Sequence, residues 1–219
     1  MSDVTKRQWR LNARSAATAI ALLLVSVADA RAQSTTASGT EAVRGFYAVL
    51  ASTMKDGARL GASGRFARLQ PAVRNVFDVP VMARLAFGPG WDSLPAAQQH
   101  AATAAFERYI VALYADRFDT YSGEQLEVIG ERQIGAGVVV QSRIVKSNGE
   151  PVAINYLMRP EGNAWQIADV YLDGTISELA TRRSEFAAIL RAQGIDGLIA
   201  TLNRKAELLS GTGGAAQRS

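Results

Sequence analysis

The sequence predicts an α+β protein in which a curved, four-stranded antiparallel sheet packs against helices on its concave side. Four strand-like segments follow one another between residues 125 and 172, and three short, glycine-containing links join them. Links this short require antiparallel neighbours, because parallel strands need long crossover connections. The segments before and after this region carry apolar residues at helical spacing instead. Helices that are separated in this way from an antiparallel sheet are typical of the α+β class.

Helices are predicted on the amino-terminal side of the sheet. Four segments there carry apolar residues at helical spacing: residues 41–55, 66–77, 78–85 and 95–119. Gly57 and the glycines after it mark the end of the first segment, and Pro71 predicts an entry or a break in the second. Asp78 is a candidate cap for the third segment, and Pro95 fits the first turn of the fourth.

The end of the sheet and the helix after it organise the rest of the chain. The predicted strands are residues 125–133, 137–145, 151–159 and 164–172. Alternation gives the last strand one side with a carboxylate and one apolar side: Ile167, Asp169 and Tyr171 against Ala168, Val170 and Leu172. A turn at Asp173-Gly174 leads into a predicted helix over 175–193, a stop at Gly194 and a second helix over 195–209. We expect the helix to fold back onto the sheet and to leave a pocket where the sheet curves away.

The first 32 residues have the three parts of a secretory signal peptide. Four basic residues precede an apolar run at 16–27, and small residues follow it at Ala28, Ala30 and Ala32. The run is shorter than the roughly 20 residues that a membrane-spanning helix needs. We therefore expect export and cleavage after Ala30 or Ala32; the alternative is an uncleaved amphipathic anchor. The expected organisation is a signal peptide at 1–32, a flexible stretch at 33–40, a single α+β domain at 41–210 and a disordered tail at 211–219.

Composition and charge exclude several classes of function. The whole chain carries 24 basic and 20 acidic residues, and removal of the leader would leave 19 and 18. A chain so close to neutral lacks the basic footprint of a nucleic-acid-binding protein. It contains no cysteine, which excludes disulfides and thiolate metal ligands, and its single histidine, His100, lies among polar residues and alanines. The sequence therefore predicts no metal, no cofactor and no serine hydrolase triad.

Asp169 is the carboxylate of the predicted last strand, and it has two interpretations. A carboxylate that faces an apolar cavity can have a raised pKa and act as a base, here together with Tyr156 or Tyr171. That arrangement would make the protein a small isomerase or hydratase. Alternatively, Asp169 pairs with Arg182 or Arg183 or caps backbone amides, which is the interpretation that we favour. The two arginines are themselves either solvated or placed to meet a lipid phosphate.

The many aromatic and aliphatic side chains can either fill a core or line a cavity for acyl chains. Such a cavity needs apolar area and few polar groups. Because a dry pocket disfavours an unpaired carboxylate, we expect the Val170 side of the last strand to face it. We predict seven lining residues: Tyr109, Leu113, Tyr114, Tyr156, Met158, Val170 and Phe186. A core without a void would instead indicate a periplasmic scaffold that binds only protein partners.

Several stretches together resemble the MlaC family of periplasmic phospholipid-binding proteins, also called the toluene-tolerance family. They are FDVPVMARLAFGPGW (77–91), YADRFDTYSGE (114–124) and DVYLDGTISELATRRSEFAAIL (169–190), with the helix start at 95–106. The stretch 60–80 and the form TISELATRRSEF are most similar to HpnM, the branch associated with hopanoid biosynthesis. Where a typical MlaC reads Ser-Leu after the glycine of the turn, this chain has Thr175-Ile176-Ser177.

The resemblance implies a particular fold and a particular activity. The implied fold is an NTF2-like cone, which is a curved antiparallel sheet with helices, plus extra helices that complete a lipid pocket. The implied activity is that of a periplasmic carrier without catalysis, which holds a phospholipid or a hopanoid-like lipid. Such a carrier shuttles its lipid between inner- and outer-membrane complexes, and we expect it to be a monomer.

Overall fold

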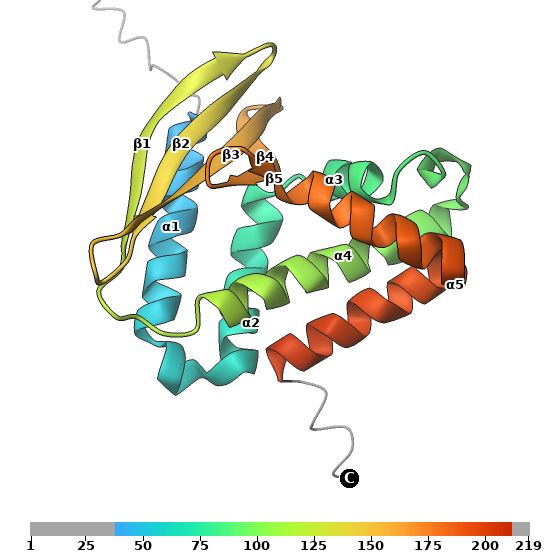
Figure 1. Cartoon of the computed structure of the whole chain (residues 1–219), viewed down its shortest axis with the longest axis horizontal. Helices are drawn as coiled ribbons and strands as arrows, with labels where there is room; N and C mark the ends of the chain where they lie inside the picture. The colour runs from blue at the N-terminus through green and yellow to red at the C-terminus, as the bar shows by residue number, and fades with distance from the viewer. Residues whose placement is uncertain (1–37, 212–219) are drawn as a thin grey trace, which may run out of the picture. The chain divides into compact units, whose positions relative to one another are not determined.

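The computed structural model describes residues 38–211, which form an α+β unit of helices and one antiparallel sheet (Figure 1). The helices are α1 (Gly39–Lys55), α2 (Gly57–Val76), α3 (Val79–Phe87), the 3-10 turn η1 (Trp91–Ser93), α4 (Ala96–Arg117) and α5 (Glu178–Ser210). The strands are β1 (Gln125–Ile134), β2 (Gly137–Val145), β3 (Pro151–Glu161), β4 (Ala164–Leu172) and β5 (Ile176–Ser177). The predicted signal peptide, most of the predicted flexible stretch and most of the predicted tail lie outside the described residues.

The sheet has five strands in the order β1-β2-β3-β4-β5, and every neighbouring pair is antiparallel. The prediction of four strands was therefore wrong by one. Strand β5 pairs Ser177 with Tyr171, so the helix that we expected from Thr175 begins only at Glu178. Ser177 caps that helix, because its hydroxyl accepts a hydrogen bond from the Ala180 N–H at 2.9 Å.

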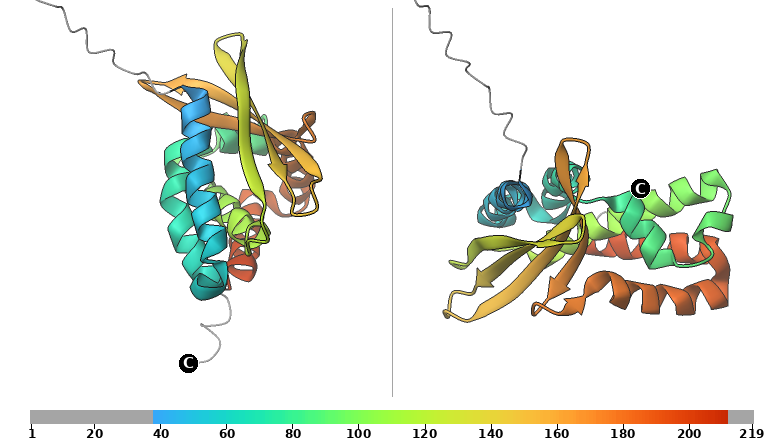
Figure 2. Two further views of the ribbon diagram at one scale, coloured as in Figure 1. Left: turned by 90° about the vertical axis from the view of Figure 1, so that its left-hand side faces the viewer. Right: turned by 90° about the horizontal axis from the view of Figure 1, so that it is seen from above.

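One face of the sheet is covered by helices and the other is open to solvent. On strand β2, Val138, Val140 and Ser142 are buried, whereas Gln141 and Arg143, on either side of Ser142, are exposed. This alternation is typical of an antiparallel sheet with one face on the core. Helix α1 packs against the covered face, as the views in Figure 2 show.

A bulge changes the predicted sides of strand β4. The register shifts opposite Leu157 and Met158, so that Met158 pairs with Ile167 and Tyr156 pairs with Val170. Ala168 is the extra residue, and Ile167 consequently shares a face with Val170, which simple alternation had placed on the opposite side. All four residues from Ile167 to Val170 are buried.

The amino-terminal helices begin and end differently from the prediction. Ser38 caps α1, because its Oγ accepts a hydrogen bond from the Glu41 N–H at 3.1 Å, so the helix includes residues that we expected to be flexible. Gly57 starts α2 and packs so closely that a Cβ there would lie 1.9 Å from the Asp119 carbonyl oxygen. Within α2 the backbone leaves the helical conformation at Gly61 (φ 62°, ψ −179°) rather than at Pro71, where we predicted an entry or a break.

Helices α4 and α5 form the layer that extends beyond the sheet (Figure 1). The predicted stop at Gly194 is confirmed, because its φ of 67° and ψ of −172° interrupt α5 and turn the chain back. The second half of α5 lies beside α4, where Arg108 donates to Asn203 Oδ1 at 2.6 Å. The first half packs on α3 through Phe186 and Phe87, whose ring centroids are 5.6 Å apart. Within residues 38–211, no helix is both long enough and apolar enough to cross a membrane.

Candidate functional site

A cavity of about 210 Å³ lies between helix α4, the start of α5 and strands β3 and β4, and Phe77 and Met82 also contribute to its wall. The α4 side chains come from one face of the helix, at alternating spacings of three residues and one residue. The lining residues are Phe77, Met82, Phe106, Tyr109, Ile110, Leu113, Tyr114, Arg117, Phe118, Ile154, Tyr156, Val170, Leu172, Glu178, Leu179 and Arg182. Apart from Arg117, Glu178 and Arg182, this wall is aliphatic or aromatic.

The cavity has a buried end and a mouth. Most of the aliphatic and aromatic lining side chains are buried, including Phe106, Tyr156 and Val170. The mouth consists of the lining residues that are partly or fully exposed: Leu113, Tyr114, Arg117, Phe118, Leu172, Glu178 and Arg182. All three charged lining residues belong to the mouth. An apolar ligand can therefore enter the buried end while a polar group stays among charges and solvent.

Three tyrosines lie in the cavity wall or directly behind it. Tyr47 donates to Ser142 Oγ at 2.7 Å, because the single proton of that serine hydroxyl is donated to the Ile154 carbonyl. Burial raises the pKa of Tyr114 and of Tyr156, so both phenols stay neutral in the physiological range. They add hydroxyl groups to the wall but no charge, which keeps the wall compatible with acyl chains.

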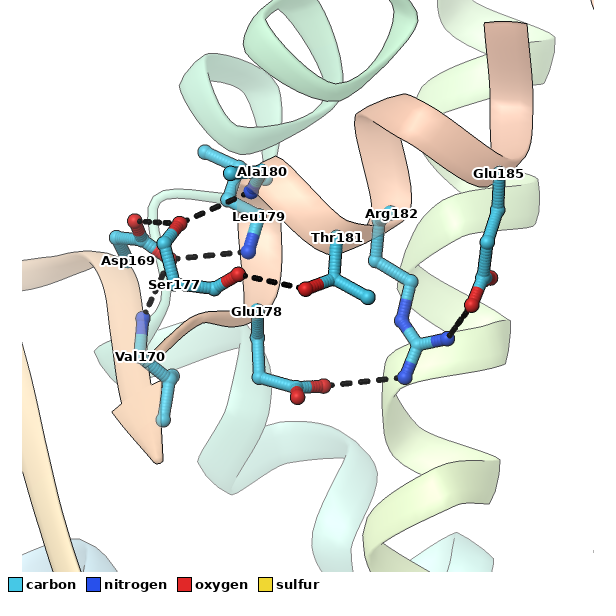
Figure 3. A network of polar contacts seen from close by, with 9 residues as sticks. All are labelled: Asp169, Val170, Ser177, Glu178, Leu179, Ala180, Thr181, Arg182 and Glu185. Atoms are coloured by element: carbon cyan, nitrogen blue, oxygen red, sulfur yellow. Dashed lines mark hydrogen bonds and ion pairs between the residues drawn. The ribbon is translucent and has the colours of Figure 1, made fainter. Parts of the chain in front are cut away.

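Asp169 fixes the start of α5 against strand β4 (Figure 3). Its Oδ1 accepts from the backbone N–H groups of Val170 at 2.8 Å and Leu179 at 3.1 Å, and its Oδ2 accepts from Ser177 Oγ at 2.6 Å. Asp169 therefore caps backbone amides, as we favoured, and does not pair with an arginine. It is buried outside the cavity wall, which separates it from Tyr156 and removes the basis for a carboxylate and tyrosine pair in the cavity.

Arg182 joins the two helices at the mouth (Figure 3). Its Nη1 contacts both carboxylate oxygens of Glu185 at 2.9 and 3.1 Å, and its Nη2 contacts Glu178 Oε2 at 3.0 Å. Its guanidinium carbon also lies 5.6 Å from the centre of the Tyr109 ring on α4. With 14% of its side chain exposed, Arg182 is held by two carboxylates and one ring rather than solvated.

The structure brings five of the seven predicted lining residues together at the cavity: Tyr109, Leu113, Tyr114, Tyr156 and Val170. Met158 and Phe186 do not reach it. Met158 is fully buried beneath the start of α1, where its Sδ would lie 3.2 Å from a Cβ at Gly39. Phe186 is packed edge-on between Phe87 and Phe106. Helical and strand spacing identify inward-facing residues, but they do not distinguish a filled core from a void.

Sequence reasoning considered Arg182 as a contact for a lipid phosphate, but it missed Arg117 and the place of Glu178 at the mouth. Arg117 lies eight residues after Tyr109 on the same stripe of α4, so the continued helical spacing could have identified it. Glu178 and Glu185 lie four residues before and three residues after Arg182, which is the spacing of neighbours on a helix surface. That spacing indicates the ion pairs, but only the fold places them beside a cavity.

A second, more open hollow lies between α3, η1 and the first half of α5. It has a volume of about 430 Å³ and is lined by Phe87, Trp91 and Leu190, with Arg183 and Arg191 at its side. Neither arginine forms an ion pair within residues 38–211. The described part of the chain contains no group of three residues suited to hold a metal ion, and His100 is exposed on α4.

The fold and cavity define an α+β protein with a preformed apolar site and a charged mouth. The family model described as MlaC protein matches residues 47–204. Because this match covers most of the chain, the protein belongs to the MlaC family.

Two known proteins are similar to this chain. The intermembrane phospholipid transport system binding protein MlaC of Haemophilus influenzae is 27% identical over 124 residues, which cover 54% of this chain and 58% of that protein. The match thus spans little more than half the length of this curated relative. A phospholipid-binding protein of Ralstonia solanacearum, solved in complex with a phospholipid, superposes with a TM-score of 0.70. It is 22% identical, and the match covers 80% of this chain and 99% of that one, which shows a shared fold.

Proposed function

We propose that this protein is a carrier that holds a phospholipid with acyl-chain carbons in the cavity and the head group at the mouth. The observation that carries the proposal is the distribution of charge, since the buried end is apolar and all charged lining residues lie at the mouth. The names of the two similar proteins, one a binding protein of a phospholipid transport system and the other a phospholipid-binding protein, support the same ligand class.

The size of the cavity constrains how a lipid would fit. About 210 Å³ is below the roughly 300–1,000 Å³ of typical ligand pockets. We infer that bound lipid either widens the cavity by moving α5 away from α4 or leaves part of its chains outside. About ten buried methylene groups, at about 0.8 kcal/mol each, would supply about 8 kcal/mol. That free energy corresponds to a dissociation constant of about 1 μM, which is tight enough to retain lipid during purification.

Native mass spectrometry of the purified protein, followed by solvent extraction, tests the proposal. We expect an added mass equal to one phospholipid, and the extract should contain that lipid in an amount equal to the protein. Protein stripped of lipid should regain the added mass after incubation with phosphatidylglycerol vesicles. A protein that is consistently empty and takes up nothing from vesicles would contradict the proposed function.

We propose a periplasmic location and membrane-bound partners for the carrier. Residues 1–32 have the pattern of a cleaved signal peptide, and a lipid carrier between two membranes needs a donor and an acceptor complex. Amino-terminal sequencing of the exported protein should begin at Arg31 or Gln33. Size-exclusion chromatography with light scattering should give the mass of a monomer. An uncleaved protein found in the membrane fraction would refute this part of the proposal.

The lipid class within the family can be proposed more narrowly. The stretches 60–80 and 175–186 support membership in the HpnM branch, and with it a hopanoid-like ligand as the second candidate. We also propose that the curved sheet with its helices is an NTF2-like cone, as the family resemblance implies. A rigid polycycle cannot bend into a narrow space as an acyl chain can, so it requires the wider, opened cavity. The extracted lipid decides between the candidates, because a polycyclic triterpenoid and a diacyl phospholipid differ in mass and fragmentation.

A further inference from the structure

The charges at the mouth differ in how completely they are neutralised. Glu178, Arg182 and Glu185 form a closed cluster in which both terminal guanidinium nitrogens contact carboxylate oxygens at 2.9 to 3.1 Å. The cluster carries one positive and two negative groups, so it offers a lipid no free cation. Its remaining carboxylate oxygen, Oε1 of Glu178, would repel an anion that approached Arg182.

Arg117 is the charged lining residue that is left uncompensated. It is the last residue of α4, it is exposed, and it forms no ion pair with any residue of the described chain. Its positive charge and that of Arg182 both act on the Tyr109 phenol, whose pKa is raised by burial and lowered by the two guanidinium groups. Both arginines line the cavity, and both belong to its mouth.

Lys205 is a second cation near the mouth that forms no ion pair within residues 38–211. Its Nζ lies 5.8 Å from the centre of the Tyr109 ring, but Lys205 does not line the cavity. The Lys205 ammonium group adds to the positive potential around the mouth, but it does not contact a head group that lies in the mouth. Arg117 thus remains the cation that a head group can touch while its chains stay in the cavity.

We propose that Arg117 binds the phosphate of the carried lipid and selects phosphate-bearing lipids over neutral lipids with the same chains. A guanidinium group matches a phosphate with two parallel hydrogen bonds, and a single free guanidinium matches the single charge of a phosphodiester. This inference rests on the proposed function and adds to it the residue that recognises the head group. Because the mouth is open to solvent, the interaction adds about 1 kcal/mol, which corresponds to a preference of roughly five-fold.

Competition between a charged and a neutral lipid tests the inference. Stripped protein is incubated with phosphatidylglycerol vesicles that contain a minor fraction of diacylglycerol with identical chains. Bound lipids are extracted, and their ratio is normalised to the vesicle composition. The wild-type protein should favour phosphatidylglycerol about five-fold, and Arg117→Gln, which keeps a polar side chain but loses the charge, should reduce the ratio to near one.

Two further variants make the result specific. Arg191→Gln removes another exposed, unpaired arginine, but one that lies in the hollow beside α3, so its ratio should equal that of the wild type. Glu178→Gln removes one negative charge from the closed cluster and with it part of the repulsion of an anion near Arg182, so it should raise the ratio above that of the wild type. Far-UV circular dichroism checks that each variant is folded.

The outcomes separate this inference from the proposed function. If the wild-type protein takes up neither lipid, the proposed function fails. If both lipids enter but Arg117→Gln leaves the ratio unchanged, the carrier function stands and the role of Arg117 is refuted. A loss of preference in Arg191→Gln equal to that in Arg117→Gln would also refute it, because overall charge would then explain the selectivity.

Discussion

Asp169 provides the most direct test of how the cavity wall is held together. It is 7% exposed and accepts three hydrogen bonds that tie strand β4 to the start of α5. Asp169→Ala would leave two buried backbone N–H groups and the Ser177 hydroxyl without an acceptor, at about 1–3 kcal/mol for each. Because the site can relax in part, we expect a total loss of about 3 to 5 kcal/mol. Asp169→Asn keeps one acceptor oxygen but loses the charge, and should cost about 2 kcal/mol.

Urea unfolding followed by far-UV circular dichroism measures both losses. Asp173→Asn is the matched control, since Asp173 lies in the turn directly after the same strand, is exposed and has a φ of 48°. Asparagine tolerates that backbone conformation, so the control should change the free energy of unfolding by less than about 0.5 kcal/mol. A loss below about 1 kcal/mol in Asp169→Ala would refute the capping role that we assign to this carboxylate.

Three further predictions follow from the fold and the cavity. Val170→Glu places a carboxylate in the apolar wall at a cost of several kcal/mol to a bound chain, so the amount of lipid extracted per protein should fall at least about ten-fold. The control Gln141→Glu, on the exposed face of the sheet, should not change that amount. Unaltered lipid in folded Val170→Glu would show that the wrong face of the sheet was assigned to the cavity. Gly194→Ala forces a side chain into a backbone conformation that is nearly exclusive to glycine, and it should lower the free energy of unfolding by about 1–3 kcal/mol in urea titrations. The control Gly45→Ala, in the interior of α1 with open space around it, should instead be stabilising. Equal effects of the two substitutions would contradict the break in α5 at Gly194. Because burial raises the pKa of Tyr156 in the folded state above 10.0, its contribution to stability should be complete below about pH 10 and should fall above it by up to about 1.4 kcal/mol per pH unit for each such tyrosine. Between about pH 9 and 11.5, the melting temperature should therefore fall less steeply for Tyr156→Phe than for the wild-type protein. Parallel curves for the two proteins would refute Tyr156 as an origin of the pH dependence.

Local signals in the sequence were sufficient for much of the architecture. Antiparallel pairing followed from links too short for a crossover, and the break in α5 followed from Gly194 between two apolar helical stripes. The sequence also favoured a structural role for Asp169, either an ion pair with Arg182 or Arg183 or a cap on backbone amides, and the structure shows the cap. Each of these inferences depends on residues that are close together in the chain.

Features that depend on tertiary packing could not be predicted in the same way. The bulge at Ala168 inserts one residue into an otherwise regular alternation, and no local signal marks it. Strand β5 has two residues, too few for a periodicity, and it exists because Ser177 pairs with Tyr171. Phe186 faces inward as its spacing predicts, but neighbouring rings fill the space around it, so inward direction alone does not identify a cavity wall.

The position of the lipid itself tests the central claim, and a crystal structure of the lipid-loaded protein would measure it. We expect electron density for acyl carbons between Leu113 on α4 and Val170 on β4, with the phosphate next to Arg117. We also expect α5 to lie farther from α4 than in the structure described above, because the present cavity of about 210 Å³ is narrow for a lipid. Density in the hollow between α3 and α5, beside Trp91 and Leu190, with the cavity still closed, would contradict the assignment of the lipid site.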